Sequence, residues 1–145
     1  MSVEWKELAR AGFRVTAADR WTMIVDYIPG PARLKIEAWG MWPSGVSPCG
    51  PDGDTTADPL PAVASALAAA AMSPPPSYPV GALLGKIGGS TAGRAEGKVF
   101  AIGRCCVIDL AENGGGPLFV AVNADAKTFP DERYTAHVIV SCARP

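Results

Sequence analysis

Two segments of the chain place apolar residues at every second position, with strict apolar–polar alternation in residues 32–38 and one apolar residue, Ile139, on the other face in residues 134–142. Residues 32–38 read Ala-Arg-Leu-Lys-Ile-Glu-Ala, and residues 134–142 read Tyr-Thr-Ala-His-Val-Ile-Val-Ser-Cys. Successive side chains of a strand point to opposite faces of a sheet. Each segment therefore predicts a strand with one face toward the core and one face toward solvent. The side chains expected in the core are Leu34, Ile36, Leu118 or Phe119, Val138 and Val140.

Shorter apolar runs bounded by Gly or Pro predict the remaining strands. They cover residues 21–28, 80–87, 98–102, 104–110 and 118–123. About eight short strands with turn signals between them are typical of a sandwich or a barrel. The sequence therefore predicts an all-β fold, built as an antiparallel β-sandwich.

Two stretches favour helices instead. Residues 2–11 begin with Ser2, which can cap a helix, and are followed by Gly12 as a stop. Residues 62–71 are mostly alanine, which loses least on entering a helix, and a run of prolines follows. We therefore expect a short N-terminal helical arm over residues 1–12, a single sandwich domain over residues 13–145, and an Ala/Pro-rich insertion within that domain.

Composition narrows the class of protein. The 145 residues are 48% hydrophobic and 19% charged, with a net charge of −1, which is typical of one globular domain without a basic surface for nucleic acid. No apolar run approaches the length of a membrane span. The first residues lack the apolar core of a signal peptide, so we expect synthesis in the cytoplasm and leave the final location open.

The four cysteines lack the spacing of a metal site, and two of them, Cys105 and Cys106, are adjacent. We expect reduced thiols rather than disulfides. Cys106 and Cys142 share a strand face with apolar neighbours, so both are expected to be buried.

Four motifs follow one another in a characteristic order: Ala38 to Trp42, Gly50 to Asp54, Gly81 to Gly88, and Leu118 to Asn123. In this order they resemble the calcium-dependent galactose-binding bacterial lectins (the LecA-like family), over most of the chain. The resemblance implies a jelly-roll β-sandwich of the galactose-binding-domain-like type. It also implies a non-catalytic, carbohydrate-binding function.

The resemblance implies a degenerate calcium and sugar site in the loop after Asn123. Thr128 is kept, Ala124 stands where the family has a calcium-binding Asp, and acidic residues stand where it has a pair of Asn. Calcium prefers such oxygen ligands. The implied metal ligands are Asp125, Thr128, Asp131 and Glu132. The implied carbohydrate-binding residues are Trp42, Asp54, Asp125 and Thr128. The positions of the family's sugar-contacting His and Gln fall near Ala57 and Leu60.

The residues alone leave alternatives open. The acids after Asn123 also fit solvated loop residues or the paired carboxylates of a glycosidase. His137, the only histidine, lies within a predicted strand without a positioned partner, so we expect no enzyme activity. Trp21 and Trp39 are expected in the core, whereas for Trp42 core packing and stacking on a sugar are both open.

A second hypothesis comes from a different class of protein. The chain would be a structural or assembly subunit of a phage tail or another secreted particle, such as a virion. The sandwich would then be a docking scaffold for a protein partner or for further copies of itself. The replaced ligand positions, the N-terminal arm and the insertion favour this alternative.

Overall fold

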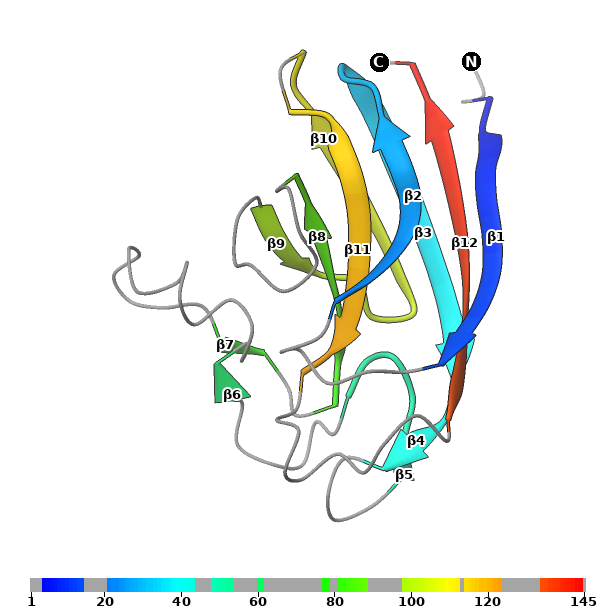
Figure 1. The fold of residues 1–145 in the computed structure, drawn as a ribbon, viewed down its shortest axis with the longest axis vertical. Helices are drawn as coiled ribbons and strands as arrows, with labels where there is room; N and C mark the ends of the chain where they lie inside the picture. Colours follow the sequence, from blue (N-terminus) through cyan, green and yellow to red (C-terminus); the bar gives the residue numbers. More distant parts are fainter. Residues whose placement is uncertain are drawn as a thin grey trace.

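The computed structural model describes residues 4–14, 21–43, 48–53, 60–61, 77–78, 81–88, 98–112, 114–123 and 134–144. Two antiparallel four-stranded sheets contain most of them (Figure 1). The first sheet has the order β1 (Lys6–Arg14), β12 (Thr135–Ala143), β3 (Ala32–Gly40) and β10 (Cys105–Leu110). The second has the order β2 (Thr22–Ile28), β11 (Gly116–Val122), β8 (Leu83–Ile87) and β9 (Lys98–Ala101).

This strand order is that of a jelly roll. Each sheet combines strands from the two halves of the sequence, and the chain crosses from one sheet to the other between β1 and β2 and again between β2 and β3. None of the described residues is helical. Two short pairs complete the described strands: β4 (Trp42–Pro43) with β5 (Pro48–Cys49), and β6 (Leu60–Pro61) with β7 (Ser77–Tyr78). The all-β jelly-roll sandwich expected from the sequence is confirmed.

The N-terminal helix is a wrong prediction. Residues 6–14 form strand β1, which pairs along its length with β12. Ala9, Ala11 and Phe13 are half-buried and lie opposite the core residues of β12, while the residues between them are exposed. The tertiary pairing therefore overrides the helix propensity of this Ala-, Leu- and Glu-containing segment. The helix expected over residues 62–71 lies outside the described residues.

The core lies between the two sheets. The first sheet contributes Leu34, Ile36, Val138 and Val140, and the second contributes Leu118, all fully buried. Ile36 lies opposite Val140 on one side and opposite Cys106 on the other, so inward residues of three neighbouring strands meet in one row. Burying an aliphatic side chain of this size stabilises the fold by about 1.5–3 kcal/mol. The core residues expected from the alternating pattern are confirmed.

The two ends of the sandwich differ. The start of β1 and the end of β12 lie together at one end, and the β4–β5 pair lies at the other (Figure 1). We call the second end the loop end; its described residues are 40–43, 48–53, 81–83 and 123. All four motifs of the lectin resemblance reach it. In the described part of the chain, no helix is long and apolar enough to cross a membrane.

Candidate functional site

Backbone hydrogen bonds tie the loop end together. The N–H of Gly81 donates to the Asn123 carbonyl over 2.9 Å, and the N–H of Asn123 donates to the Ala82 carbonyl over 2.8 Å. These bonds extend the β8–β11 ladder to the last residue of the Leu118 to Asn123 motif. Asn123 is fully buried. The point at which the expected calcium loop leaves the sheet is therefore firmly held.

The turn over residues 50–53 is anchored from two sides. The N–H of Gly53 closes the turn on the Gly50 carbonyl over 2.9 Å, and the Pro51 carbonyl accepts the N–H of Leu83 over 2.8 Å. The Asp52 carboxylate accepts the backbone N–H of Arg104 over 2.9 Å and forms an ion pair with the Arg104 guanidinium at 3.0 Å. The turn that precedes Asp54 is thereby fixed to β8 and to the β9–β10 turn.

Gly103 makes this anchorage possible. Its φ of +61° lies in the left-handed region, and a Cβ at this position would lie 2.6 Å from Oδ1 of Asp52. Any larger residue would both strain the backbone and displace the carboxylate. The β9–β10 turn is thus shaped to receive Asp52.

Trp42 lies inside the loop end and does not face outward. Its side chain is 1% exposed and belongs to the core, and its indole N–H donates to the Gly81 carbonyl over 2.8 Å. In this position neither face of the ring is free to stack on a sugar. The structure therefore assigns Trp42 to core packing, which corrects its expected carbohydrate-binding role.

The other predicted site residues lie outside the described part of the chain. These are Asp54, Asp125, Thr128, Asp131 and Glu132. Among the described residues there is no group of three or more His, Cys, Asp or Glu side chains that could hold a metal ion. The calcium site and the acidic alternatives to it therefore stay predictions.

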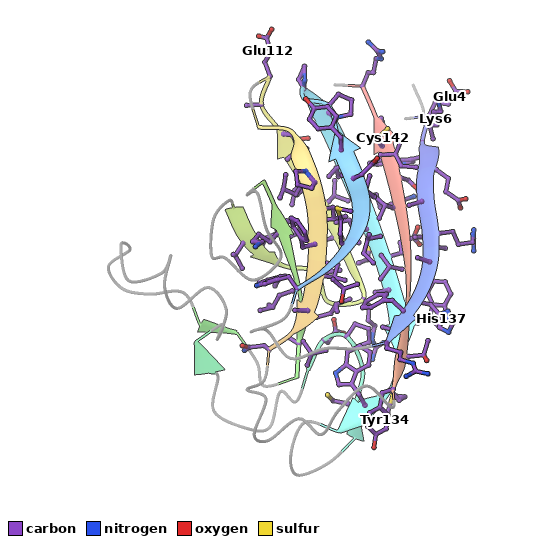
Figure 2. All side chains as sticks on the ribbon, in the orientation of Figure 1. Glu4, Lys6, Glu112, Tyr134, His137 and Cys142 are labelled. Carbon is purple, nitrogen blue, oxygen red and sulfur yellow. The ribbon has the colours of Figure 1, made fainter. Side chains whose placement is uncertain are left out.

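The exposed aromatic residue beside the loop end is Trp39. Its side chain is 46% exposed, contrary to the core position expected from the sequence. It lies directly opposite His137 on β12, and the two rings stack with centroids 5.4 Å apart and planes 13° apart. His137 and Tyr134 both lie toward the loop end (Figure 2). The alternation of β3 predicts this outward direction: because Leu34, Ile36 and Ala38 face inward, the next residue, Trp39, must face outward.

Gly12 lies beside the His137 imidazole, on the side away from Trp39. It lies opposite His137 in the β1–β12 ladder, and a Cβ on it would lie 3.1 Å from Nδ1 of His137. A larger side chain here would press on the imidazole. We call Trp39 and His137 together the aromatic platform.

A buried lysine lies on the outward side of the second sheet. Lys86 is fully buried, and its Nζ lies 5.2 Å from the centroid of the Trp21 ring and 4.8 Å from that of Phe119. Aromatic faces attract a cation, which offsets part of the cost of removing the ammonium group from water. Trp21 is buried, as expected. This cluster is closed to solvent and stabilises the sheet.

All four cysteines are free thiols. The buried one is Cys49, whereas Cys106 and Cys142 are half-buried, so full burial of the last two is a wrong prediction. Burial, followed by the charge of neighbouring Cys105, raises the pKa of the Cys106 thiol to about 11, against a smaller lowering by a hydrogen bond to the Ile36 backbone. Cys106 is therefore an unreactive thiol at neutral pH.

A cleft lies at the end of the sandwich opposite the loop end. It runs between the start of β1, the end of β12 and the turn between β2 and β3, where Glu4, Lys6 and Cys142 are found (Figure 2). None of the predicted site residues lines it. The cleft therefore has no part in the expected sugar site.

Comparisons with known proteins add no family assignment. No protein-family model matches the chain, and no curated protein matches it. The function of the chain is therefore inferred from its jelly-roll fold, its loop end and its aromatic platform.

Proposed function

We propose that the chain is a non-catalytic, lectin-like module that binds carbohydrate beside the loop end. The observation that carries the proposal is the aromatic platform: an exposed indole, stacked on an imidazole, on β3 one residue before Gly40, whose carbonyl lies beside Gly50 of the turn that precedes Asp54. Pyranose rings have apolar C–H faces that stack on aromatic faces, and polar edges that need hydrogen-bond partners. Trp39 takes the stacking role that the sequence suggested for Trp42.

The platform is suited to binding because it is held in place before any ligand arrives. Trp39 and His137 are directly opposed in the β3–β12 ladder, and the imidazole lies over Gly12 on its other side. A side chain that is already ordered loses little conformational entropy on binding. The exposed part of the indole can therefore act as a fixed surface for a sugar ring.

Calcium is part of the proposal through the resemblance to the lectin family. Asp125, Thr128, Asp131 and Glu132 are hard oxygen donors of the kind that Ca²⁺ prefers. When bound, the ion would supply coordination sites for sugar hydroxyls. Ala124 removes one carboxylate from this set, so we expect weaker calcium binding than a complete donor set would give.

The experiment is a glycan array with the wild-type chain, with and without EDTA, followed by titration of any bound sugar. Trp39→Ala should weaken binding at least tenfold and leave the fold intact. Tyr27→Ala is the matched control, since Tyr27 is an exposed aromatic residue on β2, in the other sheet, and should leave binding unchanged. Absence of binding to every glycan, or equal binding by Trp39→Ala, would refute the proposal.

The assembly-subunit alternative makes a different prediction. It expects a partner protein to bind through residues 2–11 and 61–79. Of these, residues 6–11 belong to strand β1, which is integrated into the first sheet rather than projecting as a helical arm. Capture of a protein partner that is lost when residues 61–79 are deleted, together with a blank glycan array, would favour this alternative.

A further inference from the structure

The four edge strands of the sandwich differ in how well they are protected against pairing with another chain. Natural sheets protect their edges with charges, irregular register or short strands. β1 carries exposed Lys6, Glu7, Arg10 and Arg14 and has a register shift against β12. β2 pairs with β11 through two register shifts, and β9 has only four residues. Each of these edges has at least one protecting feature.

β10 has none of these features to a comparable degree. It pairs with β3 over all six of its residues without a register shift. Its sequence, Cys-Cys-Val-Ile-Asp-Leu, contains a single charge, Asp109, and Arg33 on β3 already binds that carboxylate at 2.7 Å. Among the described strands, β10 pairs with β3 alone. Its other edge is regular and largely apolar.

The ladder shows which backbone groups point to that edge. The Arg104 carbonyl accepts the N–H of Ala38 over 2.9 Å, one step beyond the pairing of Cys105 with Glu37. In an antiparallel pair, successive residues alternate between bonding to the neighbour and pointing away from it. Cys106 and Ile108 therefore bond to β3, while Cys105, Val107 and Asp109 direct their N–H and C=O groups outward.

The side chains of the three outward-bonding residues are also accessible. Val107 is 53% exposed, and Cys105 and Asp109 are exposed as well. On the inward face, Cys106 and Ile108 are only half-buried although they pack against the core. A strand added beside β10 would cover both rows.

We propose that β10 is a self-association surface, on which β10 of a second copy pairs antiparallel about a two-fold axis through Val107. In this register Val107 lies opposite its own counterpart, and Cys105 lies opposite Asp109 of the second copy. All outward N–H and C=O groups of these residues are then used, which makes about six backbone hydrogen bonds. Centring the pair on Cys106 or Ile108 leaves outward groups of β10 unpaired.

Charge favours a second copy over a charged partner. Beside the edge, Arg33 pairs with Asp109, and Lys35 lies 3.8 Å from Glu37. Two cations and two anions therefore cancel, so two copies meet without net repulsion, and an acidic or basic partner finds no excess charge to bind. An apolar residue on the axis is compatible with its own image, whereas a charged residue there would repel itself.

The size of the surface sets the strength of the interaction. One pair of six-residue strands buries less than the roughly 1,600 Å² of a standard stable interface. We therefore expect a concentration-dependent dimer rather than an obligate one.

The two-fold axis also sets the direction of the two loop ends. β3 runs toward the loop end and β10 runs away from it, so the axis turns the two loop ends in opposite directions. If the proposed carbohydrate binding holds, such a dimer bridges two glycan-bearing surfaces.

The test is sedimentation velocity from micromolar to millimolar concentration, in reducing buffer and without sugar. The wild type should shift from monomer to dimer, and Val107→Lys should raise the dissociation constant at least tenfold with an unchanged melting curve. Met23→Lys is the matched control, because Met23 is an equally exposed apolar residue on β2. Val107→Thr, which keeps the β-branched shape, should still dimerise. A wild type that stays monomeric, or a Val107→Lys chain that dimerises like the wild type, would overturn the proposal.

A cross-link tests the register. In a Cys105→Ser background, Val107→Cys places two thiols on the axis, directly opposite each other in a hydrogen-bonded pair with a Cα separation of about 5.5 Å. A short bis-maleimide, which bridges thiols that lie too far apart for a disulfide, should give a covalent dimer of this chain but not of the Cys105→Ser parent. Failure to cross-link where the wild type sediments as a dimer would overturn the Val107-centred pairing. Because no sugar is present, these results are independent of whether the chain binds glycans.

Discussion

The sheet β1-β12-β3-β10 turns charged side chains and the aromatic platform outward, whereas the outward positions of β8 and β11 in the other sheet are buried. Leu84 lies opposite Ala121 there, and Lys86 lies opposite Phe119, with all four nearly or fully inaccessible to solvent. The first sheet thus has one core face and one water face, and the second is buried on both faces over these two strands.

This difference decides what each sheet can do. The outward face of the first sheet is accessible and carries the candidate sugar-stacking residue and the proposed dimer edge. The outward face of β8 and β11 holds a buried lysine between two rings, a contact that stabilises the sheet. Pairs of equivalent substitutions, one on each sheet, test whether the distinction holds.

The largest expected difference is between two tryptophans. Trp21→Ala removes a buried ring that covers Lys86 and should lower the free energy of unfolding by about 3–5 kcal/mol. Trp39→Ala removes a ring that is 46% exposed and should lower it by roughly 1 kcal/mol. Urea denaturation of both variants measures the contrast. Equal losses would mean that the aromatic platform is as structural as the buried cluster.

Two lysines give the next contrast. Lys86→Ala leaves a cavity between Trp21 and Phe119 and removes their cation–π contacts, so it should destabilise the fold by about 2–4 kcal/mol. Lys35→Ala affects a partly exposed side chain near Trp5 and Glu37 and should change stability by about 0.5 kcal/mol. Lys86→Met, which keeps the volume of the side chain, should recover part of the loss. A Lys86→Ala chain as stable as the wild type would contradict the role of the cluster.

The sequence predicts the buried face of a strand where the alternation is strict. β3 alternates strictly over residues 32–38, so its inward residues follow from the pattern, whereas its pairing with β12 is visible only in the structure. β1 was misread because its inward residues include small alanines among good helix formers, and only pairing with β12, far along the chain, makes it a strand. The core position expected for Trp39 is wrong because the alternation of β3, rather than the aromatic character of the side chain, decides which way it faces.

The candidate site was harder to predict because its contacts are distant in sequence. The burial of Trp42 depends on a carbonyl at Gly81, and the anchoring of the turn depends on Arg104 meeting Asp52. Neither contact follows from local patterns. The described parts of the four motifs reach one end of the sandwich, but the motifs alone do not show which tryptophan of that region faces outward.

The two cysteines of β10, which lie on opposite faces of the strand, should react at different rates. Cys105 is exposed on the outward face, and Cys106 is half-buried on the inward face with its pKa raised to about 11. Only the thiolate reacts, so at pH 8 alkylation of Cys106 should be at least tenfold slower than that of Cys105. Mass spectrometry of peptides labelled at micromolar protein concentration measures both rates. Similar rates at the two positions would show that the inward face of this edge is open to solvent.

The smallest expected effect concerns the exposed ion pair at the end of β10. The hydrogen bond from the Arg33 guanidinium is the main cause that lowers the pKa of the Asp109 carboxyl; desolvation opposes it, and the charge of the guanidinium lowers the pKa further. A lowered pKa means that the folded state favours the ionised carboxylate. The associated stabilisation is therefore present above the ordinary carboxyl pKa, and it is lost as the pH falls through the lowered value. Because both side chains are exposed, we expect only a slight change in the acid denaturation midpoint.

An NMR titration measures the effect directly. Arg33→Gln should raise the pKa of Asp109 toward its ordinary value. Lys35→Gln, which removes the neighbouring cation paired with Glu37, should leave the pKa of Asp109 unchanged. An Asp109 pKa that does not respond to Arg33→Gln would show that this pair does not form in solution, and the neutral charge balance beside the dimer edge would then have to be reconsidered.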